Sequence, residues 1–201
     1  MIAILDYGSG NLRSAQRACE ETKHEVVITS DPSVAFNADG LVVPGVGAFG
    51  ACVEGLRAIE GDQIIRSRVM EKKKTLGICV GMQILFDESE ELYANQNPQG
   101  LGIAHGRVVK LDAPVIPHIG WNTIAAPEGS ILFNGIENER FYFVHSYAAL
   151  SVSPQFKSTS AHYGEQFVTA IESDTVSAVQ FHPEKSGAAG LRLIQNWADS
   201  L

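Results

Sequence analysis

The first half of the chain alternates short apolar runs with longer stretches in which apolar residues recur every three or four positions. The short runs predict β-strands, and the periodic stretches predict amphipathic helices. This alternation is typical of a parallel sheet with helices on its faces. In chain order, we expect a strand at 2–5, a helix at 11–22, strands at 26–29 and 41–43, a helix at 48–70, a strand at 76–79 and a helix at 82–85.

The second half of the chain has a different pattern. Apolar runs follow one another there without helical stretches between them, which predicts an antiparallel extension of the sheet. These runs are 108–111, 141–144, 167–171 and 176–181. A closing helix from about Ser186 is expected to bury one stripe, made of Leu191, Ile194, Trp197 and Leu201. We therefore predict an α/β fold in which an open parallel sheet is flanked by helices and carries an antiparallel extension, with residues 1–201 forming one domain.

The composition narrows the class of protein. Of 201 residues, 45% are hydrophobic and 19% are charged, which is ordinary for a globular protein and unlike a disordered chain. A net charge of −8 argues against sequence-independent binding to nucleic acid, because such binding relies on basic side chains that displace counterions from phosphates. The apolar segment 1–5 ends at Asp6 without a basic leader, so we expect neither a signal peptide nor a membrane span.

The cysteines stand far apart in the chain, at Cys19, Cys52 and Cys79, and no C-x-x-C pair occurs. Their odd number and wide spacing indicate neither a disulfide framework nor a zinc site. We therefore expect a cytoplasmic protein that uses neither a metal nor a cofactor.

The segment around Cys79 has the features of a nucleophile elbow. Cys79 lies between Gly77 and Gly81, at the end of an apolar run and just before a helical stretch. Small neighbours at such a junction let the chain turn sharply enough to present a reactive side chain. A helix N-terminus and a nearby imidazole would both favour the thiolate, which is the nucleophilic form of cysteine.

A histidine and a glutamate a hundred residues later supply the other parts of an acyl-transfer site. His182 would take the thiol proton and return it to the leaving nitrogen, while Glu184 would orient the imidazole and stabilise its cation. Both follow the run 176–181, and side chains two apart on a strand share a face, so we expect them to point the same way. Taken singly, Cys79 would be a buried small residue, His182 a strand-end histidine and Glu184 a solvated acid. The joint occurrence of all three favours catalysis.

The glycine loop 45–50 matches G-x-G-x-x-G and admits two interpretations. A dinucleotide-binding turn would follow the first strand, whereas this loop follows the third and stands directly after Pro44. The favoured alternative is an oxyanion hole, in which backbone N–H groups of Val46 and Gly47 stabilise the anionic tetrahedral intermediate. The N–H group of Val80, directly after the nucleophile, would be the second donor.

Several of these segments are similar to the signatures of class I, triad-type glutamine amidotransferases. They are 44–47 (Pro-Gly-Val-Gly), 77–83 (Gly-Ile-Cys-Val-Gly-Met-Gln) and 182–184 (His-Pro-Glu). Further segments together resemble the glutaminase subunits of imidazole glycerol phosphate synthases, namely 6–11 (Asp-Tyr-Gly-Ser-Gly-Asn), 117–122 (Pro-His-Ile-Gly-Trp-Asn), 142–147 (Tyr-Phe-Val-His-Ser-Tyr) and 182–186 (His-Pro-Glu-Lys-Ser). The resemblance runs from end to end of the chain and implies a flavodoxin-like, class I glutamine amidotransferase fold.

The resemblance also implies an activity and a partner. The chain would hydrolyse L-glutamine to L-glutamate and ammonia through a thioester on Cys79. The partner would be a cyclase subunit with a (β/α)8-barrel fold, which uses the ammonia to make imidazole glycerol phosphate and an aminoimidazole carboxamide ribonucleotide in histidine biosynthesis. Glutamine would be bound by Gly45, Gln83, Glu91, His145 and Ser146, and the surface facing the barrel in the heterodimer would include Asn11, Trp121, Asn122, Tyr142 and Lys185.

Alternatives remain open at the level of sequence. The chain could serve another class I amidotransferase, such as the glutaminase of pyridoxal phosphate or anthranilate synthesis, although those families do not combine the same segments. It could also be a non-catalytic module that has kept the sheet, since a fold alone does not establish a function. Without the resemblance, Trp121 would be expected to pack in the core or against a loop. Lys185 would be a solvated charge, and Glu91 would belong to the solvent-exposed end of a helix.

Overall fold

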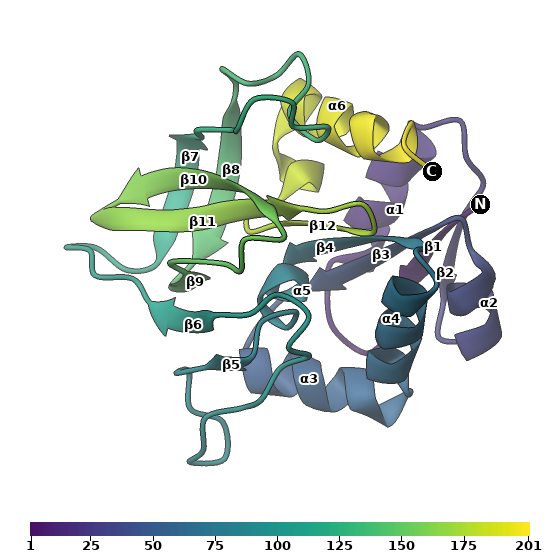
Figure 1. Cartoon of the computed structure of the whole chain (residues 1–201), viewed down its shortest axis with the longest axis horizontal. Coiled ribbons are helices and arrows are strands. Elements are labelled where there is room, and N and C mark those ends of the chain that lie inside the picture. Colours follow the sequence, from purple (N-terminus) through teal and green to yellow (C-terminus); the bar gives the residue numbers. More distant parts are fainter.

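The computed structural model describes residues 1–201 and is built on one large mixed sheet (Figure 1). Its seven strands follow the order β10-β11-β12-β4-β3-β1-β2. Five of them run parallel to one another: β1 (Ile2–Leu5), β2 (Val26–Thr29), β3 (Gly40–Gly45), β4 (Lys74–Cys79) and β12 (Val176–Val179). The antiparallel hairpin of β10 (Lys157–Tyr163) and β11 (Glu165–Glu172) extends the sheet on one side. The predicted α/β architecture is confirmed.

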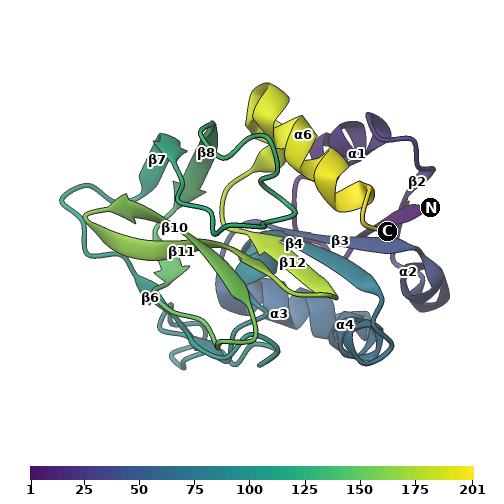
Figure 2. The same ribbon diagram turned by 45° about the horizontal axis from the view of Figure 1, so that its top comes forward.

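Helices cover both faces of this sheet, as Figures 1 and 2 show. One face carries α1 (Leu12–Glu20) and α6 (Gly187–Ala198), and the other carries α3 (Phe49–Ala58) and α4 (Gly61–Met70). Every residue of β1 and β3 is buried, because central parallel strands are covered on both sides. This two-sided burial explains why the strands were recognisable as continuous apolar runs.

The single helix predicted at 48–70 is wrong, because the structure has two helices there. The break lies between α3 and α4, where Glu60 adopts a left-handed conformation with φ of 56°. A short helix, α2 (Pro32–Asn37), was also not expected. Its N-terminus is capped by Asp31, whose carboxylate accepts hydrogen bonds from the N–H groups of Ser33 at 2.7 Å and Val34 at 3.2 Å.

The apolar run 176–181 was predicted to belong to the antiparallel extension, but it lies inside the parallel part of the sheet. Its strand, β12, ends at Val179 and pairs parallel with β4, so it belongs to the parallel core while its other edge accepts the antiparallel β11. Strands between residues 88 and 149 form two small sheets. One contains β5 (Glu88–Ser89), β6 (Arg107–Lys110) and β9 (Tyr147–Ala149), and the other pairs β7 (His118–Thr123) with β8 (Arg140–His145).

The closing helix α6 buries most of the predicted stripe. Ile194 and Trp197 are buried, and Trp197 packs so closely on β3 that a Cβ atom at Gly40 would lie 2.6 Å from its ring. Leu201 is half-buried and also contacts Gly40. Leu191 is exposed instead, and Leu193 takes its place in the core.

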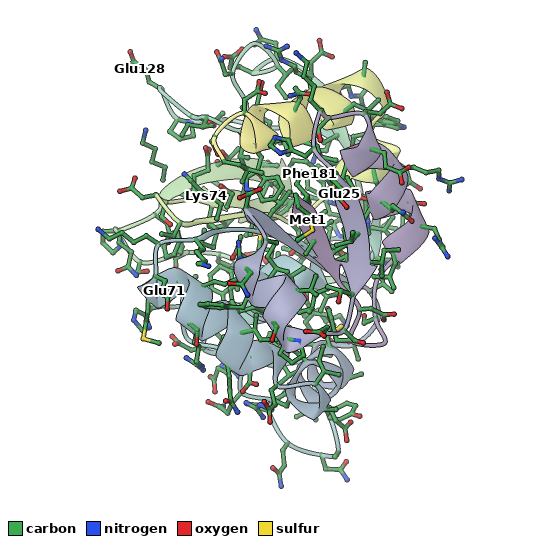
Figure 3. The ribbon with its side chains drawn as sticks, turned by 90° about the vertical axis from the view of Figure 1, so that its right-hand side faces the viewer. Met1, Glu25, Glu71, Lys74, Glu128 and Phe181 are labelled. Carbon is green, nitrogen blue, oxygen red and sulfur yellow. The ribbon has the colours of Figure 1, made fainter.

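An aromatic cluster anchors the segment that follows β12. Phe181 lies inside the molecule, whereas Glu71 and Glu128 lie at its periphery (Figure 3). The ring of Phe181 is fully buried, and its centroid lies 4.4 Å from that of Phe141 and 5.4 Å from that of Phe143. This packing fixes the backbone directly before His182.

Candidate active site

The expected sharp strand-to-helix turn is present at Cys79. Strand β4 ends at Cys79, and the short helix α5 (Val80–Gln83) begins at the next residue. Cys79 has φ of 57° and ψ of −114°, a conformation that costs a residue with a side chain about 1–3 kcal/mol. Close packing of the backbone around the turn maintains it, since a Cβ atom at Gly81 would lie 1.9 Å from the carbonyl oxygen of Val43. At Gly77 it would lie 2.6 Å from the carbonyl oxygen of Gly81.

His182 and Glu184 form a buried pair next to the elbow. The Nδ1 atom of His182 lies 2.7 Å from Oε1 of Glu184, and the two side chains are 5% and 3% exposed. The reason given from sequence, a shared strand face, is wrong. His182 follows the end of β12 and caps a 3-10 turn, η1 (Pro183–Lys185), which contains Glu184. The turn, and not a strand, brings the two side chains together.

The main chain of His182 is held on both sides. Its N–H group donates to the carbonyl oxygen of Tyr142 at 2.9 Å, and its carbonyl oxygen accepts from the Ser186 hydroxyl at 2.6 Å. Ser186 also accepts from the N–H group of Tyr142 at 3.0 Å. These contacts dock the turn onto β8 and fix the position of the imidazole.

The environment of His182 favours its charged form. Burial by itself lowers the pKa of an imidazole, but the side chains of Cys79 and Glu184 both stabilise the cation, and the net effect raises the pKa of His182 to about 9. The imidazole is therefore protonated at pH 7. A histidine cation between a thiol group and a carboxylate is the arrangement that activates a cysteine nucleophile.

A cavity of about 270 Å³ opens over the thiol and the imidazole. It is lined by most of the residues predicted for the site together with two neighbours, Val144 and Tyr147. The full set is Val46, Gly47, Cys79, Val80, Gln83, Glu91, Val144, His145, Ser146, Tyr147, His182 and Lys185. The structure thus brings together residues from five separate segments of the chain.

Gly45 is not part of the cavity wall. It pairs with Cys79 across β3 and β4, and a Cβ atom there would lie 2.6 Å from the backbone nitrogen of Gly81. Its lack of a side chain lets the loop after β3 approach the elbow. Gly47, two residues on, has φ of 88°, which favours glycine.

The N–H group of Val46 is already engaged in this structure. It donates to the Ser9 hydroxyl at 3.1 Å, and the same hydroxyl donates to the Val46 carbonyl oxygen at 2.8 Å. The Cys52 thiol also donates to that carbonyl, at 3.4 Å. The N–H group of Gly47 makes no hydrogen bond within the protein. Val46 therefore has to leave Ser9 before its N–H group can serve an oxyanion.

Glu91 links the cavity to the start of helix α3. One of its carboxylate oxygens, Oε2, accepts a hydrogen bond from the N–H group of Phe49 at 2.8 Å. This contact places a negative charge at the positive end of a helix. Since Glu91 also lines the cavity, it presents a carboxylate suited to an ammonium group.

Other parts of the cavity wall contain amide and imidazole groups. Gln83 is 4% exposed and donates from Nε2 to the Tyr147 carbonyl oxygen at 2.9 Å and to Oε1 of Gln180 at 3.0 Å. His145 contacts the same carbonyl through Nδ1 at 3.0 Å and His118 through Nε2 at 3.0 Å. Three members of this network were not predicted from the sequence, although each lies in a segment with a recognisable pattern: His118, Tyr147 and Gln180.

The residues predicted to face a partner lie on the surface near this site. Trp121 is 48% exposed and packs edge-on against Tyr142, its cross-strand neighbour, with ring centroids 5.8 Å apart. Asn11 and Lys185 are exposed, and Lys185 also lines the cavity. Asn122 is half-buried and donates to the carbonyl oxygen of His162 at 3.1 Å.

Comparisons with known proteins agree with this geometry. A family model described as glutamine amidotransferase class-I matches residues 3–200. The imidazole glycerol phosphate synthase subunit HisH of Nocardia farcinica is 52% identical over 208 residues, which cover 100% of this chain and 98% of the relative. The subunit of the same name from Mycobacterium bovis is 53% identical over 203 residues, with the same shares covered.

Solved structures resemble the chain in fold. A crystal structure of a glutamine amidotransferase superposes with a TM-score of 0.78 at 18% identity, covering 99% of this chain and 97% of that one. PurLQS from Thermotoga maritima gives a TM-score of 0.73 at 17% identity, covering 98% and 97%. No helix in the chain combines the length and the apolar character needed to cross a membrane. The family resemblance seen in the sequence is confirmed, and the chain belongs to the class I glutamine amidotransferases.

Proposed function

We propose that this chain is the glutaminase subunit of an imidazole glycerol phosphate synthase, which hydrolyses L-glutamine to L-glutamate and ammonia. The observation that carries the proposal is the strained Cys79 elbow next to the buried His182–Glu184 pair, with a cavity that opens over the thiol and the imidazole. Relatives that bear this subunit's name match the chain over its whole length at about half identity, which supports the choice within the family. We further propose that residues 1–201 act as one domain, in keeping with a single hydrophobic core of 53 buried residues drawn from the whole chain.

In the first half of the reaction, the Cys79 thiolate attacks the side-chain amide carbon of glutamine. The carbonyl π electrons move to oxygen and give a tetrahedral oxyanion. His182 then donates its proton to the amide nitrogen, the C–N bond breaks, and ammonia leaves with a thioester on Cys79. The raised pKa of His182 suits this role, because the imidazole enters the step already protonated.

In the second half, a water molecule attacks the thioester. The neutral His182 takes a proton from the water, a second tetrahedral intermediate forms, and its collapse breaks the C–S bond to release glutamate and the thiolate. Glu184 keeps Nδ1 of His182 in place through both halves, since this contact is buried and 2.7 Å long. The residue therefore orients the base and does not itself react.

The cavity wall supplies the groups that would hold glutamine. The Glu91 carboxylate would pair with the α-ammonium group, while the wall formed by Gln83, His145 and Ser146 would contact the rest of the amino acid. The N–H group of Val80 and a donor from the loop at Val46 and Gly47 would stabilise the oxyanion. For Val46, that role requires the peptide to rotate away from Ser9.

We also propose that the ammonia passes to a cyclase subunit, a (β/α)8 barrel, in a cytoplasmic heterodimer. The exposed Trp121, packed on the half-buried Tyr142 and accompanied by the exposed Lys185 and Asn11, supports a docking surface close to the cavity, so ammonia would leave toward the partner. The partner would use it to make imidazole glycerol phosphate and an aminoimidazole carboxamide ribonucleotide. All cysteines in the chain are free thiols, which suits a reducing compartment.

The proposal is tested by assembling the chain with a candidate cyclase subunit and comparing glutamine with ammonia as the nitrogen source. Wild-type complex should form product from both. Cys79→Ala should abolish product formation from glutamine and retain it from ammonia. The matched control, Cys19→Ala, removes a buried thiol in α1 and should retain both activities. Product from glutamine at the wild-type rate in Cys79→Ala would overturn the proposed chemistry, and no product from either source would overturn the proposed partner.

A further inference from the structure

Gln180 is a buried amide that contacts the sulfur of Cys79. The residue is 1% exposed and follows β12, the parallel neighbour of β4. Its Nε2 atom lies 3.9 Å from Sγ of Cys79, a distance at which an N–H group donates to sulfur. Gln180 does not line the cavity. Its contact with the thiol therefore comes from the protein side and leaves the face toward the substrate open.

The direction of this amide is fixed by its neighbours. The carbonyl oxygen of Tyr147 can only accept, so the group of Gln83 that faces it at 2.9 Å has to be the NH₂ group. The other hydrogen of that NH₂ group points to Gln180, which has to present its oxygen there, at 3.0 Å. The NH₂ group of Gln180 is consequently the one turned toward Cys79. A free amide could instead offer its oxygen to a thiol proton.

The Tyr147 carbonyl, from which this series of hydrogen bonds starts, also contacts a pair of histidines. His145 donates from Nδ1 to the Tyr147 carbonyl, so its Nε2 atom is the acceptor for the Nδ1–H group of His118, at 3.0 Å. Burial lowers the pKa of His118 to about 4, and burial also lowers the pKa of His145, to about 3. Both rings are neutral at pH 7, so each has a single tautomer. Every hydrogen bond in the series from His118 through His145, Tyr147, Gln83 and Gln180 to Cys79, which we call the relay, therefore has a defined donor and acceptor.

We propose that Gln180 is a positioning residue of the glutaminase, which Gln83 and the Tyr147 carbonyl orient so that it donates a hydrogen bond to the sulfur of Cys79. This inference rests on the proposed role of Cys79 as the nucleophile. The N–H group stabilises the sulfur when it carries negative charge, before attack and again when the thioester breaks. It also holds the side chain at the cavity with its free lone pairs toward the substrate.

Other titratable groups face the sulfur as well. His182 approaches from η1 and is cationic at pH 7. Tyr7, from the loop after β1, and Cys52, from α3, interact electrostatically with Cys79, and burial raises the pKa of both, so they are neutral. Gln180 does not titrate, so replacing it with methionine leaves the charges around the thiol unaltered.

The test measures how fast iodoacetamide alkylates Cys79 as a function of pH, with the modified residue identified by peptide mass spectrometry. Gln180→Met keeps an unbranched side chain and removes the donor. Gln180→Glu keeps an oxygen for Gln83 and replaces the donor by a second oxygen. The matched control is Gln166→Met, an exposed glutamine on β11. Thermal unfolding of each variant separates lost positioning from lost folding.

Gln180→Met is expected to slow alkylation at pH 7 about tenfold and to move the pH profile toward higher pH, since hydrogen bonds to charged groups are the stronger ones. Gln180→Glu should slow alkylation further, because a carboxylate repels the Cys79 thiolate. Gln166→Met should match the wild type. Gln83→Met should also slow alkylation, and the double variant Gln83→Met/Gln180→Met should be no slower than Gln180→Met alone.

The possible failures are distinguishable. If iodoacetamide and glutamine-like reagents leave Cys79 unmodified in the wild type, the proposed function fails. If Cys79 is modified but Gln180→Met keeps the wild-type rate and pH profile, the positioning role alone is overturned. A rate loss that merely follows a loss of folded protein, or additive effects of the two glutamine changes, would likewise contradict the relay.

Discussion

Replacing Ser9 by alanine should make the isolated chain a faster glutaminase. The Ser9 hydroxyl accepts a hydrogen bond from the N–H group of Val46 at 3.1 Å and donates one to its carbonyl at 2.8 Å. The first contact engages the N–H group of the Gly45–Val46 peptide, which would otherwise be free for the oxyanion, and the second holds the adjoining Val46–Gly47 peptide in the same arrangement. Ser9→Ala removes them together, so the arrangement in which Val46 can donate becomes more populated.

The expected magnitude follows from these two contacts. A hydrogen bond contributes about 0.5–1.5 kcal/mol net, so the pair stabilises the engaged arrangement by about 1–3 kcal/mol. Each 1.4 kcal/mol corresponds to a factor of ten, which gives an increase of roughly 5- to 150-fold. The gain is limited by the value of one oxyanion donor, about 10²–10³ in rate. The remaining contact from the Cys52 thiol, at 3.4 Å, favours the lower part of the range.

The assay is glutamate release by the isolated chain and by its complex with the cyclase subunit and nucleotide. Ser33→Ala, at an exposed position in α2, is the matched control and should leave the rate unchanged. We expect Ser9→Ala and wild type to converge in the full complex, on the premise that docking of the proposed cyclase subunit itself releases Val46 from Ser9. A folded Ser9→Ala chain with the wild-type rate in isolation would refute the view that this contact restrains activity.

The other predictions concern the base, its partner and the elbow. Glutamate release should decline with a midpoint near pH 9, where the raised pKa of His182 removes the proton for the leaving nitrogen; a decline centred near pH 6.5 would contradict this. The positive charge of His182 also stabilises the fold, fully below about pH 6.5, and this contribution should be lost as the pH rises through about 9. The free energy of unfolding measured as a function of pH can check this. Glu184→Gln should retain roughly 10²-fold more activity than Cys79→Ala, and equal losses would refute the division of roles. Gly81→Ala should lower the free energy of unfolding by about 3 kcal/mol, since its methyl group would lie 1.9 Å from the Val43 carbonyl oxygen, and an unchanged urea midpoint would count against this packing argument.

The sequence predicts the parts of the fold whose burial is uniform. The central strands β1 and β3 are buried throughout and therefore appear as apolar runs. Strands β7 and β10 were missed, because only one or two positions in each are buried and both carry many polar residues. The break between α3 and α4 was missed as well. Its left-handed residue is Glu60, a residue type that gives no sign of such a conformation.

The same limit applies to the active site. Cys79 and His182 lie in short motifs, so their chemistry is visible along the chain, whereas the contact between Gln83 and Gln180 joins residues 97 positions apart. Ser9 and Val46 are 37 positions apart, and only the fold shows that one engages the other. Even the His182–Glu184 pair was predicted for the wrong reason, because a 3-10 turn replaces the expected strand.

The most direct test of the central claim is covalent labelling with a glutamine analogue that carries an electrophilic ketone in place of the amide. The chain in complex with its cyclase subunit is incubated with the analogue, digested and mapped by mass spectrometry, with L-glutamine as competitor. If Cys79 is the nucleophile in a glutamine site, the label will appear on Cys79, glutamine will protect against it, and glutaminase activity will be lost in proportion. A label on Cys19 or Cys52 with Cys79 unmodified, or full activity after complete labelling of Cys79, would contradict the account.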